Sequence, residues 1–320
     1  MIAHPYAFVF PGQGSQSVGM LADASAQFPV ISEIFAEASD ALGYDLQQLA
    51  FEGPAEKLNQ TVYTQPALLA ASYAVWRVIT SQSEVVPDML AGHSLGEYTA
   101  LVCANALSFS DAIKLVAARG QFMQDAVKAG EGAMAAIIGL DDDAVANICD
   151  DVRANTQEVI APANYNSVGQ VVIAGREAAV NQAVAAAKEK GARMAVLIPV
   201  SVPSHCELMR PAAERLAALL ATITIQAPTI PVLNNVDVMA NQEPDAIRDA
   251  LVRQLYMPVR WVEIIQSFMR HDIAMIVECG PGKVLTGLNK RIDKSLQLQS
   301  LCDLASIEKI LTNANERKVT

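Results

Sequence analysis

The sequence predicts an α/β protein with a large domain of mainly parallel sheet and a small domain inserted into it. Short apolar runs alternate with amphipathic stretches at both ends of the chain, as in successive β/α units. The middle of the chain follows the order βαββαβ, which is that of a ferredoxin-like unit. A Gly-x-Ser-x-Gly motif lies where a predicted strand turns into a helix. The large domain is therefore expected over residues 1–130 and 201–320, and the small domain over residues 131–200.

The individual elements are predicted from apolar periodicity and from the residues that begin or end helices. Before the insertion, strands are expected over 7–10 and 89–91, and helices over 29–42, 65–80 and 110–130, the last with Ser110 as its N-cap. Within the insertion, strands are expected over 132–140, 158–166, 170–176 and 193–201, and helices over 141–155 and 177–191. After it, helices are expected over 211–222, 244–256 and 262–270, and strands over 230–234 and 273–279.

The composition describes an ordered protein from a reducing compartment. Of the 320 residues, 52% are hydrophobic and 18% are charged, as in a globular chain with a sizeable core. The five cysteines are scattered without a Cys-x-x-Cys pair, which argues against a disulfide framework and a cysteine-rich metal site. The chain begins without a signal sequence and contains no run of ~18 apolar residues that could span a membrane. A cytoplasmic protein without a membrane partner is expected.

The formal net charge of −11 argues against nucleic acid as a partner, because phosphate neutralisation needs clustered Lys and Arg. The same acidity would repel any anionic partner at long range, so that partner would need a local basic patch. The densest late cluster of basic residues is Lys283, Lys290, Arg291 and Lys294. Each of these residues taken alone is also consistent with a solvated helix face.

A glycine-rich loop, FVFPGQGSQSVGM at residues 8–20, includes the end of the first predicted strand. A dinucleotide-binding loop needs a third glycine where this chain has Ser17, and a phosphate-binding P-loop needs a lysine that this loop lacks. Both interpretations therefore fail. The backbone N–H groups of the loop have little side-chain bulk around them, so the loop can hold an anion of another kind.

Ser94 is the candidate nucleophile. It lies in Gly92-His93-Ser94-Leu95-Gly96, between a short apolar strand and a helix rich in Ala, Leu and Val. Glycines on both sides allow a sharp turn that pushes the hydroxyl outward, and the helix N-terminus directs partial positive charge at the reaction centre. The alternative is an ordinary tight turn between a strand and a helix.

A serine nucleophile needs a base, and the chain has four histidines. His4 lies in the terminal tail, His93 is adjacent to the serine in sequence, and His271 lies at a polar junction between a helix and a strand. His205 follows a predicted strand, where sites of α/β folds tend to lie, and is the candidate base by elimination. No Asp or Glu stands out as the third member of a triad, so a Ser–His dyad oriented by a backbone carbonyl stays open.

Arg119 lies in the middle of an apolar helix stripe, four residues from both Leu115 and Met123. A buried guanidinium without a partner is costly, so it should face an anion. In one interpretation it pairs with an internal Asp or Glu, or reaches outward to solvent. In the other, its rigid fork grips a substrate carboxylate, which would select an acyl group that ends in a carboxylate.

Successive motifs across nearly the whole chain carry a family resemblance. They are FVFPGQGSQSVGM, TQPALLAAS, AGHSLGEYTALVCA, ARGQFMQ, GAMAAIIGL, NYNSVGQVVIAG, PVSVPSHCELM, VRQLY and ECGPGKVL. Together they resemble the malonyl-CoA:acyl carrier protein transacylases of bacterial fatty acid synthesis. The resemblance implies an α/β-hydrolase-like large domain with a ferredoxin-like insertion. It also implies ping-pong transfer of a malonyl group from malonyl-CoA to the phosphopantetheine thiol of acyl carrier protein, without a cofactor.

The resemblance also assigns roles to matching residues. Ser94 would attack the malonyl thioester, and His205 would act as base and then as acid. Arg119 would hold the malonate carboxylate. Gln13 and Leu95 would offer backbone N–H groups to the tetrahedral oxyanion, so the glycine-rich loop would hold a transient negative charge rather than a phosphate.

Gln254, in VRQLY, would orient the histidine through its backbone carbonyl, which accounts for the missing carboxylate. Two loop positions depart from the usual family pattern: Met257 stands where Asn is frequent, and Val168 where Pro is frequent. Asn164 and Asn166 match the family, but no chemical role is assigned to them. Acyl carrier proteins are acidic, so docking on a local basic patch is expected.

Three alternatives remain open on sequence grounds. A serine hydrolase or thioesterase would share the turn, the histidine and the oxyanion loop, but would release free acid to water. A malonyl transferase of polyketide assembly or of a malonate decarboxylase would differ only in its acceptor. A non-catalytic module that binds a carrier protein would form no covalent intermediate.

Overall fold

The computed structural model describes residues 5–128, 130–199 and 202–316. The first part of the chain contains β1 (Tyr6–Phe10), α1 (Ala22–Gln27), α2 (Pro29–Leu42), α3 (Leu46–Glu52), α4 (Ala55–Leu58), α5 (Thr61–Gln82), β2 (Met89–Gly92), α6 (Leu95–Cys103) and α7 (Phe109–Ala126). The middle contains β3 (Gly132–Ile138), α8 (Asp142–Thr156), β4 (Ile160–Ser167), β5 (Gln170–Arg176), α9 (Glu177–Glu189) and β6 (Met194–Leu197). The last part contains the 3₁₀ helix η1 (Glu207–Met209), α10 (Arg210–Leu220), β7 (Val232–Leu233), α11 (Pro244–Gln254), α12 (Trp261–Arg270), β8 (Met275–Cys279), α13 (Val284–Ile292), β9 (Gln297–Leu301) and α14 (Leu304–Glu316).

The larger sheet has the strand order β7-β2-β1-β8-β9, and its strand pairs are all parallel. On the central strand β1, Phe8 is paired with Leu90 of β2 on one side and with Val277 of β8 on the other. Parallel strands place their carboxyl ends at the same edge of a sheet. The loops that follow β1, β2, β7 and β8 therefore meet at one edge.

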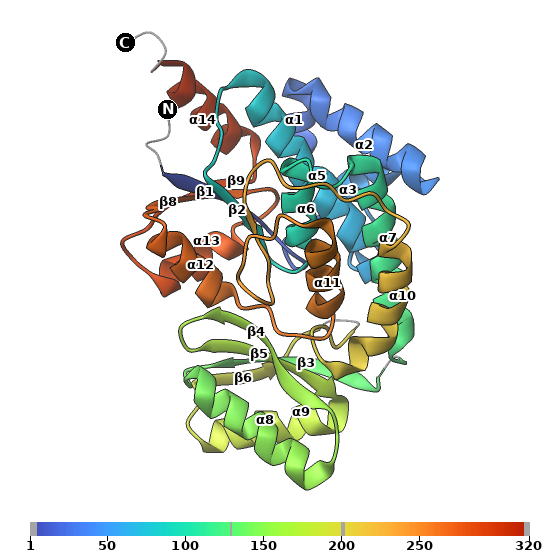
Figure 1. Ribbon diagram of the computed structural model, residues 1–320, viewed down its shortest axis with the longest axis vertical. Coiled ribbons are helices and arrows are strands. Elements are labelled where there is room, and N and C mark those ends of the chain that lie inside the picture. The colour runs from blue at the N-terminus through green and yellow to red at the C-terminus, as the bar shows by residue number, and fades with distance from the viewer. Residues whose placement is uncertain (1–4, 129, 200–201, 317–320) are drawn as a thin grey trace.

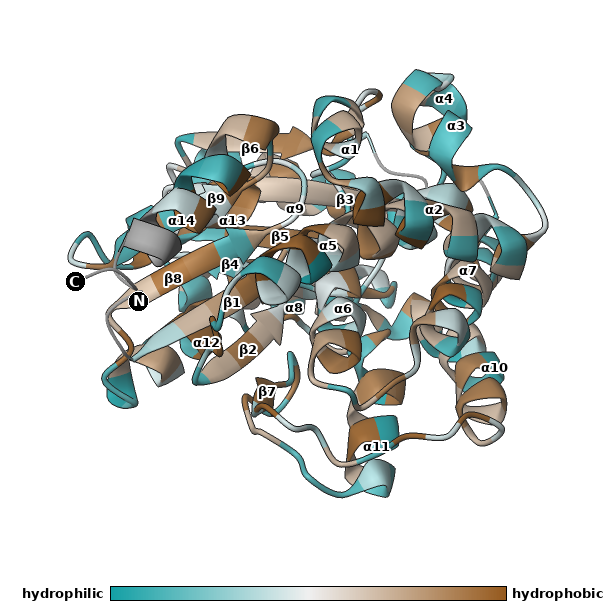
Figure 2. Ribbon diagram, turned by 90° about the horizontal axis from the view of Figure 1, so that it is seen from above, coloured by the Kyte–Doolittle hydropathy of each residue, from teal (hydrophilic) through white to brown (hydrophobic). Residues whose placement is uncertain are grey.

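Both faces of the larger sheet are buried at its central strand, β1. On β1, Tyr6, Phe8 and Phe10 belong to one core cluster, whereas Ala7 and Val9 belong to another. These five side chains are at most 1% exposed. An apolar run of this kind is what a parallel sheet covered by helices on both faces requires. Figure 2 shows the hydrophobic colouring along β2 and β8, between the surrounding helices.

The smaller sheet has the strand order β4-β5-β3-β6 with antiparallel pairs, and its elements follow the order βαββαβ. In Figure 1 it lies below the larger sheet, with α8 and α9 on its far side. The backbone N–H of Tyr165 in β4 donates to the carbonyl of Val259 at 2.9 Å, which joins this sheet to the segment between α11 and α12. The prediction of a mixed α/β protein with a parallel sheet and a separate small sheet is confirmed.

Some predicted boundaries differ from the observed ones. The N-cap of α7 is Ser108 rather than Ser110, because the Ser108 side chain accepts a hydrogen bond from the backbone N–H of Asp111. The strand expected over 230–234 is reduced to the two residues of β7 at the edge of the sheet. Some predicted ranges include residues that the structure does not describe, namely 1–4, 129, 200–201 and 317–320. They fall within the two predicted domains, within the helix predicted to reach residue 130 and within the strand predicted to reach residue 201.

Two further findings concern the helices and the cysteines. No helix among the described residues combines the length and the apolar character needed to cross a lipid bilayer. The five cysteines are all free thiols, and four of them are buried.

Candidate active site

Ser94 lies at a sharp turn between β2 and α6. Its φ of 52° falls in the left-handed region, which few residues other than glycine adopt. The flanking glycines have no room for a side chain. A Cβ at Gly92 would lie 1.8 Å from the backbone carbon of Gly96, and one at Gly96 would lie 2.1 Å from the carbonyl oxygen of Phe10. The turn therefore requires both glycines of the motif.

Asn235, just after β7, holds this turn in place. Its Oδ1 accepts a hydrogen bond from the backbone N–H of Ser94 at 2.7 Å, and its Nδ2 donates to the carbonyl of Gly92 at 2.7 Å. The backbone N–H of Asn235 donates to the buried carboxylate of Glu97 at 2.9 Å. These bonds satisfy backbone groups that a sharp turn would otherwise leave unpaired.

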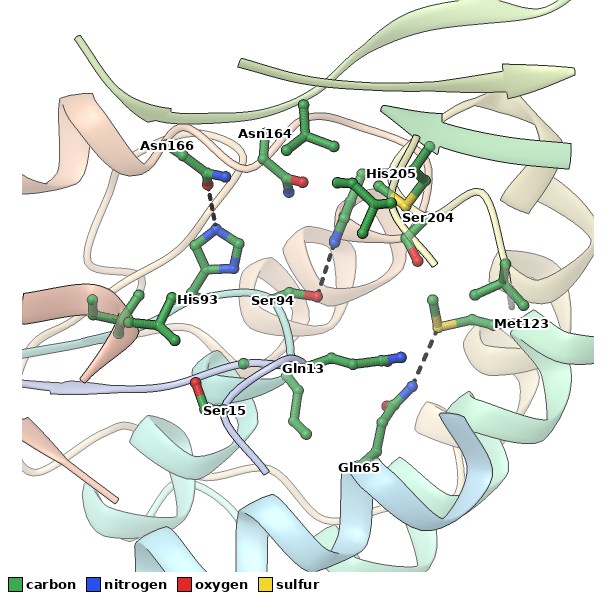
Figure 3. A pocket seen from close by; sticks show the side chains of 18 of the residues that line it. Gln13, Ser15, Gln65, His93, Ser94, Met123, Asn164, Asn166, Ser204 and His205 are labelled. Carbon is green, nitrogen blue, oxygen red and sulfur yellow. Dashed lines mark hydrogen bonds between the residues drawn. The ribbon is translucent and has the colours of Figure 1, made fainter. Parts of the chain in front are cut away.

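The imidazole of His205 contacts the hydroxyl of Ser94, although the two residues are 111 positions apart in the chain. Nε2 lies 2.9 Å from Ser94 Oγ, and Nδ1 lies 2.7 Å from the backbone carbonyl oxygen of Gln254. Since that carbonyl can only accept, Nδ1 carries the proton and Nε2 accepts from the serine hydroxyl. Figure 3 shows the two side chains pointing toward one another.

Burial, together with the positive charge of Arg119, lowers the pKa of His205 to about 3. The ring is therefore neutral at neutral pH, as a general base must be. The other described histidines have different partners: His93 contacts a side chain of β4, and His271 contacts a carbonyl of its own helix. His4 lies outside the described residues.

Arg119, in α7, is 1% exposed and directs its guanidinium at the same site. Nη2 donates to Ser94 Oγ at 3.1 Å and to Gln254 Oε1 at 3.0 Å, and Nη1 donates to Gln65 Oε1 at 2.8 Å. In the described part of the chain no carboxylate forms an ion pair with it, and its Nε is buried without a partner. The side chain neither reaches outward nor pairs with an internal Asp or Glu. It keeps donors for an anion.

Gln13, in the loop after β1, and Leu95, the first residue of α6, line the same pocket. N–H groups in the first turn of a helix lack acceptors within that helix. Among the described residues, no acceptor is found for the backbone N–H of either Gln13 or Leu95. The two loops lie very close, since a Cβ at Gly12 would lie 2.5 Å from the carbonyl oxygen of His93. They bring two available N–H groups to one pocket.

This pocket has a volume of about 200 Å³. Strands β3, β4 and β5 of the smaller sheet line one part of it, and loops and helices next to the larger sheet line the rest. Figure 3 shows Asn164 and Asn166 of β4 on one side of Ser94, with Gln13 and Gln65 on the other. Among the residues that the structure describes, no group of three or more His, Cys, Asp or Glu side chains is placed to hold a metal ion.

The sequence matches the acyl transferase domain family over residues 7–311. It is 56% identical over 307 residues to the malonyl CoA-acyl carrier protein transacylase of Salmonella typhimurium, and the matched region covers 96% of this chain and 99% of the relative. The chain belongs to the malonyl-CoA:acyl carrier protein transacylase family. It is therefore an acyltransferase. A second relative of that name, from Bacillus subtilis, is 44% identical over 310 residues and covers 97% of each chain.

Solved structures of the transacylase family share the fold. An acyl carrier protein S-malonyltransferase from Vibrio cholerae superposes with a TM-score of 0.93 at 56% identity, covering 95% of this chain and 99% of that one. A malonyl-transacylase in complex with a type II PKS acyl-carrier protein superposes with a TM-score of 0.95 at 52% identity, covering 97% of this chain and 99% of that one.

Sequence reasoning missed several buried polar residues of this transacylase site. Glu97 and Asn235 support the turn, and Gln65 contacts Arg119. The position of Asn235 after a strand end and the charge of Glu97 in an apolar helix were usable signals, but Gln65 carried none. The family resemblance implies a role for the backbone carbonyl of Gln254 alone, yet its side chain is also fully buried in the site.

Four other residues that the sequence points to differ in their position relative to the pocket. Asn164 and Asn166 both line the pocket, and Asn166 Oδ1 lies 2.8 Å from His93 Nε2. Of the two departures from the family pattern, Val168 is 68% exposed at the β4–β5 turn, and Met257 follows α11. Neither residue lines the pocket.

Proposed function

We propose that this protein transfers the malonyl group of malonyl-CoA to the phosphopantetheine thiol of acyl carrier protein, supplying fatty acid elongation. The observation that carries the proposal is the hydrogen-bonded chain from the Gln254 carbonyl through His205 to Ser94, with the buried Arg119 beside it. Membership of the transacylase family supports this donor and this acceptor.

In the first half-reaction, His205 Nε2 takes the hydroxyl proton of Ser94 while Oγ attacks the thioester carbonyl carbon. The carbonyl oxygen becomes an oxyanion that accepts hydrogen bonds from the backbone N–H groups of Gln13 and Leu95. The tetrahedral adduct then collapses and its C–S bond breaks. The CoA thiolate leaves with the proton held by His205, and a malonyl ester remains on Ser94.

The second half-reaction reverses these steps with a new thiol. His205 takes the proton of the phosphopantetheine thiol, and the thiolate attacks the malonyl ester carbonyl. The same two N–H groups hold the second oxyanion. Its collapse breaks the C–O bond, and His205 returns a proton to Ser94 Oγ. The carbonyl of Gln254 keeps Nδ1 protonated throughout, so Nε2 is the nitrogen that exchanges protons.

Arg119 would select the malonyl group by binding its free carboxylate. Its contacts with Gln65 and Gln254 are to neutral oxygens, so its charge is not cancelled by a direct partner. A guanidinium fork matches the two oxygens of a carboxylate. An acetyl group offers nothing to this fork, which gives the basis for discrimination.

The test is mass spectrometry of the protein after mixing with malonyl-CoA, with and without phosphopantetheinylated acyl carrier protein. A malonyl adduct on Ser94 is expected, and it should pass to the carrier protein rather than to water. Ser94→Ala should form no adduct, and Arg119→Ala should lose malonyl transfer while accepting uncharged acyl groups more readily. Free malonate as the main product would instead indicate a hydrolase or thioesterase, and no adduct would indicate a binding module.

The relative that was solved with a type II PKS acyl-carrier protein favours a second candidate, malonyl transfer in polyketide assembly. The chemistry on Ser94 would be identical. A comparison of kcat/KM for carrier proteins of the two pathways separates the candidates. A malonate decarboxylase carrier is a third acceptor for the same comparison.

The fold and setting that go with this function are also proposals. We propose an α/β-hydrolase-like domain over 1–130 and 201–320 and a ferredoxin-like domain over 131–200, supported by the parallel sheet and by the βαββαβ order. The reaction as written needs no cofactor, since His205 and backbone N–H groups supply the proton transfer and the charge stabilisation. A cytoplasmic location is part of the same proposal, and the five free cysteines support it.

A further inference from the structure

A carboxylate without a direct counter-ion lies behind the arginine. Glu97 is 2% exposed, and its Oε2 accepts hydrogen bonds from Gln254 Nε2 at 2.8 Å and from the backbone N–H of Asn235 at 2.9 Å. Within the described ranges, no Lys or Arg forms an ion pair with it. Buried carboxylates are normally paired with a cation. This one has a neutral amide between itself and Arg119.

That amide is the side chain of Gln254, which is fully buried. Its Nε2 donates to Glu97, and its Oε1 accepts from Arg119 Nη2 at 3.0 Å. A carboxylate only accepts and a guanidinium only donates, so the amide satisfies both neighbours in one orientation. Its Nε2 also donates to the carbonyl of Ser94 at 3.0 Å, which fixes the same orientation.

The two charges nevertheless interact. Burial raises the pKa of Glu97 and lowers that of Arg119, and the opposite charge of each residue counteracts the shift of the other. Glu97 thus helps to keep Arg119 protonated in a buried site. A direct ion pair would do this more strongly, but a bidentate pair would occupy the fork that a substrate carboxylate needs.

We propose that the side chain of Gln254 sets selectivity for a charged acyl group by holding the Glu97 carboxylate away from Arg119. Glu97 supplies a buried counter-charge, and the amide keeps this charge from closing the fork. This role is separate from that of the Gln254 backbone carbonyl, which contacts His205. The inference rests on the proposed malonyl transfer.

The test exchanges the two side chains in the variant Glu97→Gln/Gln254→Glu. The exchange preserves the composition, the net charge and the backbone carbonyl at position 254, but it places the carboxylate against Arg119. The ratio of Ser94 acylation rates with malonyl-CoA and acetyl-CoA is expected to fall by at least about tenfold, because the malonyl carboxylate then loses its charged hydrogen bond with Arg119 to a competing carboxylate. Glu97→Gln alone removes the counter-charge but leaves the fork open, so it is expected to lower this ratio much less than the exchange does.

The outcomes separate the possible roles. An unchanged ratio in the exchanged variant overturns the proposal, and so does an equal loss with both substrates, which indicates a merely structural role. If the exchanged chain does not fold, as judged by circular dichroism, Gln254→Leu decides the question. That variant lets Glu97 reach Arg119, so the ratio of malonyl to acetyl acylation rates should fall. Adding Glu97→Gln to this variant should raise the ratio again. If the ratio does not recover in the double variant, the proposal is contradicted. Failure of the wild-type chain to form malonyl-Ser94 would instead refute the proposed function.

Discussion

His205 is buried beside a cation, and this setting determines how acylation should depend on pH. Burial first, and the charge of Arg119 second, lower the pKa of His205 to about 3. A base with a lowered pKa stays unprotonated as the pH falls, until the pH approaches the lowered value. The profile of kcat/KM with malonyl-CoA, which reports the free enzyme, should therefore lack an acid limb from His205 near pH 6.5.

The profile of kcat should differ from that of kcat/KM, because a bound malonyl carboxylate offsets the charge of Arg119. The pKa of His205 should then rise, and the acid limb of kcat should lie at higher pH than that of kcat/KM. Both profiles can be measured by stopped-flow release of CoA. Glu97→Gln is the control, because ionisation of Glu97 can itself produce an acid limb near pH 7. A limb that disappears in this variant belongs to Glu97 rather than to His205. A limb of kcat/KM near pH 6.5 that persists in Glu97→Gln would contradict the assignment.

Glu97 links the same site to stability. Burial raises its pKa from 4.5 to about 7. A carboxyl group with a raised pKa in the folded state contributes stability that is present below the unfolded pKa and is lost as the pH rises through the folded value. Glu97→Gln removes this loss. The difference between the free energies of unfolding of Glu97→Gln and of the wild type should therefore increase in favour of the variant from pH 4.5 to pH 7, by up to about 3 kcal/mol.

Urea unfolding at a series of pH values measures this difference. The matched control is Glu263→Gln, a half-exposed carboxylate on α12 that is paired with Arg260, for which a much smaller change is expected. A difference between Glu97→Gln and wild type that stays constant with pH would show that ionisation of Glu97 does not oppose folding.

Much of the candidate site was predictable at the level of single residues. A motif predicts Ser94, elimination predicts His205, and a charge in an apolar stripe predicts Arg119. The structure places His205 Nε2 and Arg119 Nη2 each within hydrogen-bond distance of Ser94 Oγ. The side chains of Gln65 and Gln254 could not be predicted in this way. A neutral amide is common on surfaces as well as in cores, so its burial depends on contacts between distant parts of the chain.

Among the secondary-structure elements, α7 carries Arg119 into the core, and its N-terminus offers a local test. The Ser108 hydroxyl accepts from the backbone N–H of Asp111 at 3.1 Å, so Ser108 caps the helix. Ser108→Ala should lower the free energy of unfolding by about 1 kcal/mol. Ser110→Ala, two residues further on and inside the helix, should change it by much less. Thermal unfolding of both variants decides this, and equal losses would argue against a cap at Ser108.

The elements that sequence patterns predicted are those with long or strongly apolar runs. β1, β2 and β8 are nearly continuous apolar strands because helices cover both faces of the sheet. Weaker patterns were missed: β9 mixes Gln, Ser and Leu at the sheet edge, and α3 and α4 are too short for a periodic signal. The edge strand β7 is only two residues long. Such elements depend on their neighbours more than on their own sequence.

At the scale of the whole molecule, charge is distributed unevenly around the pocket. The net charge of −11 should repel an acidic carrier protein at long range. At the mouth of the site, however, α13 contributes Val284, Leu285 and Leu288 to the pocket lining and carries Lys290 and Arg291 in its last turn. Lys283 and Lys294 flank the same helix and are exposed. These four basic residues form the basic cluster next to the pocket.

The basic cluster should make transfer to acyl carrier protein sensitive to salt, because exposed charges steer association and are screened over about 10 Å at 0.1 M salt. We expect kcat/KM for the carrier protein to fall as the salt concentration rises. In Lys290→Glu/Arg291→Glu, kcat/KM at low salt should be lower, and it should depend less on the salt concentration. Transfer to pantetheine, a small uncharged thiol, should respond to neither change. The matched control is Lys188→Glu/Lys190→Glu at the end of α9, which also makes the net charge more negative by four but lies on the far side of the smaller sheet. If this control reduces transfer to the carrier protein as much as the α13 variant does, net charge rather than the basic cluster governs docking.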